Sequence, residues 1–144
     1  MMMMSFAMNI KGKVIKIADG DTITIQTLNN ERIKVRLYGI DAPEKKQDYG
    51  IKSLDVLKEL SYGKTVDVEV KEKDRYGRTV GIVFLNGEEI NLKMIETGNA
   101  WHYKKYAKEK ANYSNAEAEA RKSKLGLWNS DKQISPWEYR KINN

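Results

Sequence analysis

Carboxylate and arginine side chains in three short stretches of this sequence could act together on a phosphate ester. Asp41 and Glu44 follow directly on an apolar run that carries Arg36, while Asp21 and Arg78 lie at two other turns. Carboxylates are oxygen ligands that suit Ca²⁺ or Mg²⁺, and arginine can donate paired hydrogen bonds to phosphate oxygens. These residue types favour metal-assisted chemistry at phosphate, although the run from Arg36 to Glu44 taken alone also fits a strand that ends in a polar turn.

The run that carries the first arginine is predicted to be the third strand of an antiparallel meander. Apolar residues alternate with polar ones at Ile33, Val35 and Leu37, which is the pattern of a half-buried strand. Two further strands are predicted before it, at residues 9–18 and 22–26. Because hairpins bring the start of one strand beside the end of the next, the acids that flank these strands should meet at one end of the sheet.

The rest of the chain supplies two more strands and three helices. Alternating apolar residues predict strands at residues 65–70 and 80–84, and helices are predicted at residues 51–60, 91–96 and 113–124. The order of these elements suggests a small closed sheet with helices packed on it. We therefore expect a β-rich α+β fold, most simply a five-stranded OB-fold barrel with three helices.

The composition limits the classes of protein to consider. With 144 residues the chain has the length of one domain, and we expect residues 1–8 to be a disordered segment and residues 9–144 a single domain. The net charge of +6 and the pI near 9.3 favour a polyanionic partner such as nucleic acid. Cysteine is absent, which excludes a thiolate nucleophile and a cysteine-ligated metal. No run approaches the roughly 20 apolar residues of a membrane span, so we expect no membrane partner.

Three motifs occur in the order and spacing of the thermonuclease family. They are Asp19-Gly20-Asp21-Thr22, the run from Arg36 to Glu44, and Asp74-Arg75-Tyr76-Gly77-Arg78. The chain resembles staphylococcal nuclease and its homologues from about Val14 to Trp128. This resemblance implies a Ca²⁺-dependent, sugar-nonspecific nuclease on an OB-type barrel, which hydrolyses phosphodiester bonds of DNA and RNA and leaves 3′-phosphate and 5′-hydroxyl ends.

The resemblance also implies a set of metal ligands. By matching position, Asp21 and Asp41 resemble the carboxylate ligands of Ca²⁺, and the main-chain carbonyl of Ala42 resembles a third ligand. Many relatives have threonine at the position of Ala42. Because the backbone oxygen is the atom that binds, alanine should serve equally well.

Catalytic roles are implied in the same way for Glu44, Arg36 and Arg78. Glu44 resembles the residue that orients or deprotonates the attacking water, and the two arginines resemble the pair that grips the phosphate. A glutamate with an ordinary pKa of about 4.3 is a weak base for bulk water, but a nearby cation lowers the pKa of a bound water. The cation and the arginines would also offset the negative charge that develops in the transition state.

Tyrosines and lysines near these motifs are candidates for nucleic-acid contacts. Relatives carry two tyrosines soon after the second helix, and here Tyr103 and Tyr106 fall in that region, with Tyr106 the better match. Tyr76 could also stack on a base or sugar, and Lys45 and Lys104 could contact flanking phosphates. The alternative is that the tyrosines lie at the rim of the core and the lysines are merely solvated.

Three other residues are assigned structural roles. His102 is the only histidine, which excludes a mechanism with two imidazoles, and its aromatic neighbours favour a packed position. Trp128 and Trp137 are expected to anchor the C-terminal helix and tail to the barrel.

Two other functions fit parts of the sequence. A catalytically inactive binding module of the same fold would have lost one of the acids or arginines, and none is missing. An independent OB-fold single-strand binder would explain the charge and the aromatic residues, but not five polar residues in register. We therefore expect an active, monomeric nuclease for DNA and RNA, with single strands favoured and broad specificity. The family resemblance favours a secreted or surface-associated protein.

Overall fold

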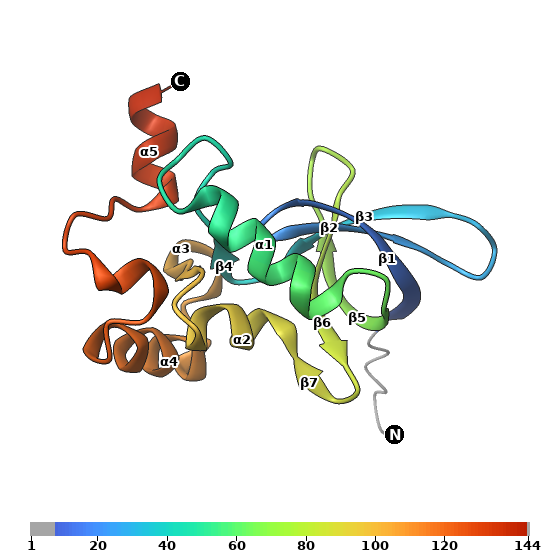
Figure 1. Cartoon of the computed structure of the whole chain (residues 1–144). Coiled ribbons are helices and arrows are strands. Elements are labelled where there is room, and N and C mark those ends of the chain that lie inside the picture. Colours follow the sequence, from blue (N-terminus) through green and yellow to red (C-terminus); the bar gives the residue numbers. More distant parts are fainter. Residues whose placement is uncertain (1–7, 144) are drawn as a thin grey trace.

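The computed structural model describes residues 8–143, and its centre is a closed five-stranded barrel (Figure 1). Three antiparallel strands form the predicted meander, β1 (Asn9–Asp19), β2 (Thr22–Gln26) and β3 (Arg32–Leu37). Strand β5 (Thr65–Lys73) pairs with β1, and β6 (Thr79–Leu85) pairs with β5. A parallel pairing between β6 and β3 closes the barrel, so the predicted β-rich OB-fold barrel is confirmed.

A glycine at the pairing that closes the barrel also permits a close approach of β6 to β5. The register of β3 and β6 places Leu37 opposite Gly81. A Cβ atom at Gly81 would lie 2.7 Å from the carbonyl oxygen of Glu69 and 2.7 Å from Cγ1 of Val68, so a larger residue would force neighbouring atoms apart. Closure fixes the end of β3, where the predicted site residues begin.

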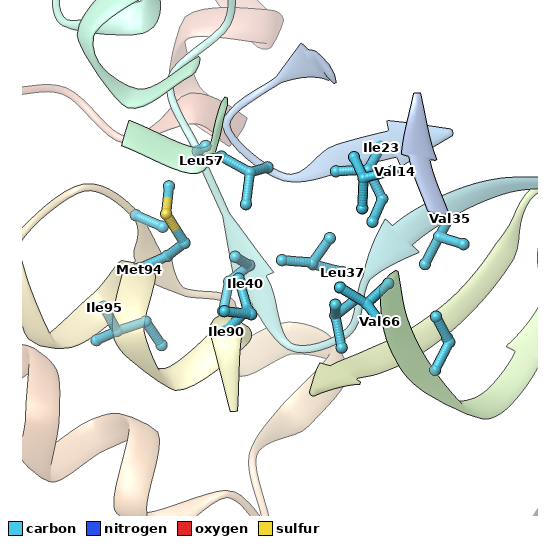
Figure 2. Packing of buried hydrophobic residues seen from close by; sticks show 14 of the residues in the cluster. Val14, Ile23, Val35, Leu37, Ile40, Leu57, Val66, Ile90, Met94 and Ile95 are labelled. Atoms are coloured by element: carbon cyan, nitrogen blue, oxygen red, sulfur yellow. The ribbon is translucent and has the colours of Figure 1, made fainter. Parts of the chain in front are cut away.

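Alternation along the strands sends every second side chain into the barrel. Val14, Ile23, Val35, Leu37 and Val66 come from four different strands and are fully buried together (Figure 2). The helices that cover the barrel extend this core with further buried side chains, among them Leu57, Ile90, Met94 and Ile95 (Figure 2).

Three helices lie where the sequence predicts them, α1 (Gly50–Ser61), α2 (Ile90–Glu96) and α4 (Ala111–Lys122). The structure adds two short helices that were not predicted, α3 (Lys104–Ala107) and α5 (Pro136–Asn143). Figure 1 shows α5 at the edge of the molecule, beside the loop that precedes α1. The other additions are β4 (Ile40–Asp41), β7 (Glu88–Glu89), β8 (Trp101–His102) and a 3₁₀ helix, η1 (Gly126–Asn129).

A short strand pairing ties the acidic loop to the segment that follows α2. Strand β4 pairs with β8, which places Asp41 opposite Trp101. The N–H of Tyr103 donates a hydrogen bond to the carbonyl oxygen of Gly39 (2.8 Å). The aromatic residues after α2 therefore lie beside the end of β3 although more than sixty residues separate them in the chain.

His102 and Trp128 are packed, as predicted. His102 is 2% exposed, with Nε2 2.7 Å from the carbonyl oxygen of Ala107 and Nδ1 2.9 Å from Oγ of Ser114. The ring of Trp128 is buried edge-on against Trp101, with 4.6 Å between the ring centroids. These contacts hold the segment between Trp101 and Trp128 together, in a cluster separate from the barrel core.

The predicted disordered segment falls almost wholly outside the described residues, since residues 1–7 are not described. Met8 is described, and its carbonyl oxygen accepts a hydrogen bond from the N–H of Val70 (2.9 Å). This bond continues the pairing of β1 with β5 by one residue. Between residues 8 and 143, no helix has the length and apolar character needed to cross a membrane.

Candidate active site

A cleft of about 720 Å³ opens at the end of the barrel where the turn between β1 and β2 meets the residues that follow β3. Most of the predicted site residues line this cleft: Asp21, Arg36, Asp41, Ala42, Glu44, Tyr76, Arg78, Tyr103 and Tyr106. Asp19 and Arg140 line it as well, and the sequence analysis assigned neither of them to the site.

Arg36 holds the inner part of the cleft together. Its Nη1 donates to the carbonyl oxygens of Leu37 (2.8 Å) and Ile40 (2.9 Å), so the guanidinium fixes the turn that leaves β3. Its Nη2 lies 3.3 Å from Oδ1 of Asp41 and 3.5 Å from Oδ2 of Asp21. The two aspartates thus meet at one end of the sheet, as the hairpin geometry predicted.

Asp21 is fixed by the backbone that follows β3. Its Oδ2 accepts a hydrogen bond from the N–H of Ala42 (2.7 Å), and its Oδ1 accepts one from the hydroxyl of Thr22 (3.0 Å). The turn must approach closely to make these bonds, because a Cβ atom at Gly20 would lie only 2.7 Å from Cβ of Ala42 and 2.8 Å from Cβ of Ser53. The glycine of the Asp-Gly-Asp motif is therefore a packing requirement of the site.

Asp19 brings a second carboxyl group beside Asp21. Its Oδ1 accepts a hydrogen bond from the N–H of Asp21 (3.1 Å). Burial, and then the charge of Asp21, raises the pKa of Asp19 to about 8. Burial also opposes ionisation of Asp21, but Arg36 and hydrogen bonds outweigh it and lower the pKa of that carboxyl. At neutral pH the pair therefore holds one proton, which a bound cation would displace.

Asp41 is held from a second side by Arg140 of α5. Nη2 of Arg140 lies 2.7 Å from Oδ2 of Asp41 and Nη1 lies 3.1 Å from Oδ1, which makes a paired hydrogen bond. The same Nη1 lies 3.2 Å from Oε1 of Glu44. Burial raises the pKa of Asp41 to about 6, although the hydrogen bonds and charge of Arg140 act against the rise. Arg140 thereby links both carboxylates to the C-terminal helix.

Sequence reasoning missed Arg140 because its position depends on where α5 docks. The start of α5 did carry a signal, since Ser135 and Glu138 have the spacing of a capping box. In the structure the N–H of Glu138 donates to Oγ of Ser135 (3.2 Å), and that hydroxyl donates to Oε1 of Glu138 (2.9 Å). This signal predicts a helix, but nothing local predicts that it meets Asp41, 99 residues earlier in the chain.

The donor atoms at the base of the cleft have the chemistry of a hard-cation site. The carboxylates of Asp21 and Asp41 and the carbonyl of Ala42 offer only oxygen, which suits Ca²⁺ or Mg²⁺. Among residues 8–143, no three Asp, Glu or His side chains form a cluster that would hold a metal ion by themselves. Arg36 and Arg140 also engage oxygen atoms of Asp41. A cation would have to share or replace these contacts.

The turn between β5 and β6 carries the second predicted arginine to the cleft. Asp74 organises this turn, because its Oδ1 accepts hydrogen bonds from the N–H groups of Tyr76 and Arg78, both 2.9 Å. Its Oδ2 lies 2.8 Å from Nε of Arg78. Arg78 therefore lines the same cleft as Arg36 but is paired with its own turn. Tyr76 is 71% exposed at the rim.

Only some of the residues predicted to contact nucleic acid line the cleft. Tyr103 and Tyr106 line the cleft with their rings edge-on, 4.9 Å between centroids. Lys104 lies on a neighbouring groove instead. Lys45 is exposed and is not among the residues that line the cleft.

Comparison with known proteins agrees with this geometry. The family described as "Staphylococcal nuclease homologue" matches residues 34–130. An "Uncharacterized endonuclease" of Haemophilus influenzae is 44% identical over 90% of this chain and 72% of its own length. Micrococcal nuclease of Shigella flexneri is 39% identical over 92% of this chain and 82% of its own length. Staphylococcal-like nuclease CAN1 of Arabidopsis thaliana is 42% identical over 77% of this chain, which covers 34% of that protein. The chain belongs to the staphylococcal nuclease family.

Proposed function

We propose that this protein is a Ca²⁺-dependent nuclease that hydrolyses DNA and RNA and leaves 3′-phosphate and 5′-hydroxyl ends. One observation carries the proposal: five charged residues from three separate motifs line a single cleft, in a chain of a nuclease family. These residues are Asp21, Arg36, Asp41, Glu44 and Arg78.

The metal ligands in this proposal are the carboxylates of Asp21 and Asp41 and the carbonyl of Ala42. A bound Ca²⁺ would supply positive charge beside the phosphate and lower the pKa of the attacking water. Arg36 already bridges the two carboxylates, so it would keep them together before and after the cation binds.

Glu44 is the proposed general base. Its Oε1 is held by Arg140, so the carboxylate is oriented and Oε2 would accept the proton from water. Arg36 and Arg78 would donate hydrogen bonds to the phosphate as its negative charge increases. Because Asp74 engages Nε of Arg78, the terminal nitrogens of that guanidinium are the atoms that would reach the phosphate.

The proposed contacts go to phosphate and sugar, which carry no base information. We therefore propose broad specificity, with single strands favoured because exposed tyrosines such as Tyr76 and Tyr106 can stack only on unpaired bases. We also propose that the protein acts as a monomer, since every proposed catalytic group comes from one chain.

The first test is cleavage of single-stranded DNA and of RNA in the presence of Ca²⁺, Mg²⁺ or a chelator, with analysis of the product ends. Cleavage of both substrates with Ca²⁺, with 3′-phosphate ends, is expected. Tight binding without cleavage under any of these conditions would instead identify an inactive nucleic-acid-binding module.

Two variants separate the proposed roles. Glu44→Gln should abolish most turnover while Ca²⁺ affinity changes little, whereas Asp21→Asn should weaken Ca²⁺ binding measured by calorimetry. If both variants lose both properties to the same extent, the separate assignment of base and ligand is wrong.

A further inference from the structure

A second hollow of about 500 Å³ lies beside the cleft, between β8, α3, α4 and α5. Tyr103 lines both hollows, so they adjoin at this residue. We call the second hollow the α5 groove. Its floor includes Trp101, Tyr103 and Trp137, and its rim carries Lys104, Lys105 and Lys141.

The rim of the α5 groove carries positive charge that nothing within the groove offsets. The three lysines are exposed. Glu117 is the only acid among the described residues that line it, and both of its oxygens are engaged. Oε1 accepts a hydrogen bond from the N–H of His102 (2.8 Å), and Oε2 lies 3.3 Å from Nη2 of Arg121. The groove therefore suits an anionic occupant.

The floor is an ordered aromatic surface. The ring of Trp137 stacks on that of Tyr103, with centroids 5.3 Å apart and planes 2° from parallel. Trp101 meets Trp137 edge-on at 5.3 Å. Trp137 thus attaches α5 to Trp101 and Tyr103 rather than to the barrel core, and the rings are already fixed against one another. A ligand that covered this floor would not have to order it, which lowers the entropic cost of binding.

We propose that the α5 groove is a second subsite that holds the single strand flanking the phosphodiester bond in the cleft. Lys105 and Lys141, together with Lys104, contact its phosphates, and the aromatic floor takes up apolar faces of sugars and bases. This inference rests on the proposed function for the identity of the ligand. It adds that affinity grows with strand length once a strand is long enough to pass Tyr103.

The test measures binding in a Glu44→Gln background, so that cleavage does not interfere. Dissociation constants are measured by fluorescence anisotropy for an oligothymidylate of twelve nucleotides and for a dinucleotide, at several salt concentrations. Lys105→Glu and Lys141→Glu are combined in one variant. The matched control combines Lys34→Glu with Lys64→Glu, which makes the same charge change at exposed residues that line neither hollow.

The groove variant should lose about tenfold in affinity for the longer strand, and its salt dependence should become less steep by roughly 1.4 in the logarithmic slope. The advantage of the longer strand over the dinucleotide should shrink accordingly. The control should lose much less. Equal losses in the two double variants, or no loss in either, would overturn the proposal.

This experiment separates the groove from the nuclease assignment. If the protein with Glu44 intact cleaves nucleic acid but the groove variant binds the longer strand as well as its parent, only the groove is refuted. If length-dependent binding disappears in the groove variant while no cleavage is found, the groove stands and the nuclease assignment fails. Absence of binding to both oligonucleotides would overturn the groove, and the nuclease assignment would fail with it only if the protein with Glu44 intact also cleaves neither DNA nor RNA.

Discussion

Asp41 is held by two arginines that reach it from different parts of the fold. Arg36 lies five residues earlier, on a strand of the barrel, and its side chain is 15% exposed. Arg140 lies 99 residues later, on the C-terminal helix, and its side chain is 33% exposed. The inner contact follows from strand and turn geometry, whereas the outer one exists only because a helix docks beside the cleft.

The outer contact is one of several that attach α5 to the rest of the fold. Nε2 of Gln47 donates to the carbonyl of Ile134 (2.8 Å) just before the helix, and Trp137 stacks on Tyr103. Gln47 follows the acidic loop, and Tyr103 lines the cleft. Helix α5 therefore packs against residues at the border of the site. It lies outside the residues that the family model matches. Disturbing the helix should change the site more than the barrel.

The largest expected difference between the two arginines is in the rate of cleavage. Arg36→Gln should lower the single-turnover rate on single-stranded DNA by about 10²- to 10³-fold, the usual cost of one preorganised donor to a developing negative charge. Arg140→Gln should cost about tenfold, because Arg140 contacts and orients Glu44, the proposed general base, rather than the substrate. Equal losses would mean that Arg140 also acts on the substrate.

The free energy of unfolding should also distinguish Arg36 from Arg140. Without a metal, Arg36→Gln leaves Asp21 and Asp41 buried without their shared partner and should lower the free energy of unfolding by about 2 to 4 kcal/mol. Arg140→Gln opens a more exposed pair and should cost about 1 kcal/mol or less. Urea unfolding in chelator measures both. A larger loss for Arg140→Gln would show that α5 is an integral part of the folded core.

The raised pKa values of Asp19 and Asp41 should make the free energy of unfolding depend on pH. The pKa values of Asp19, about 8, and Asp41, about 6, lie above their unfolded values, so the folded chain binds more protons between about pH 4 and pH 8. In chelator, stability should therefore fall as pH rises through this range. Asp19→Asn should flatten the upper part of the profile, and Ca²⁺ should restore stability at pH 8. A profile that rises from pH 5 to pH 8 would contradict the buried proton.

The part of the site around Arg36 could be predicted from sequence because its residues lie on consecutive strands of one meander. Asp21, Arg36 and Asp41 sit at strand ends whose alternation is visible, and hairpin geometry alone brings them together. Asp19 belongs to the same motif, but the burial that changes its chemistry appears only in the fold. The position of Arg140 could not be predicted, because it depends on where a short helix docks. That docking is set by long-range contacts, which the hydrophobic pattern of the sequence does not indicate.

The smallest expected effect concerns metal affinity, and it tests whether Arg140 competes with a cation. Because the guanidinium occupies both carboxylate oxygens of Asp41, Arg140→Gln should tighten Ca²⁺ binding by about three- to tenfold, measured by calorimetry at constant ionic strength. Lys141→Gln removes the same charge from the next residue and should have a smaller effect, since Lys141 lines the α5 groove rather than the cleft. Weaker Ca²⁺ binding in Arg140→Gln would instead mean that the outer arginine orients Asp41 for the metal. Competition would then be the wrong description, and both arginines would support the same ligand.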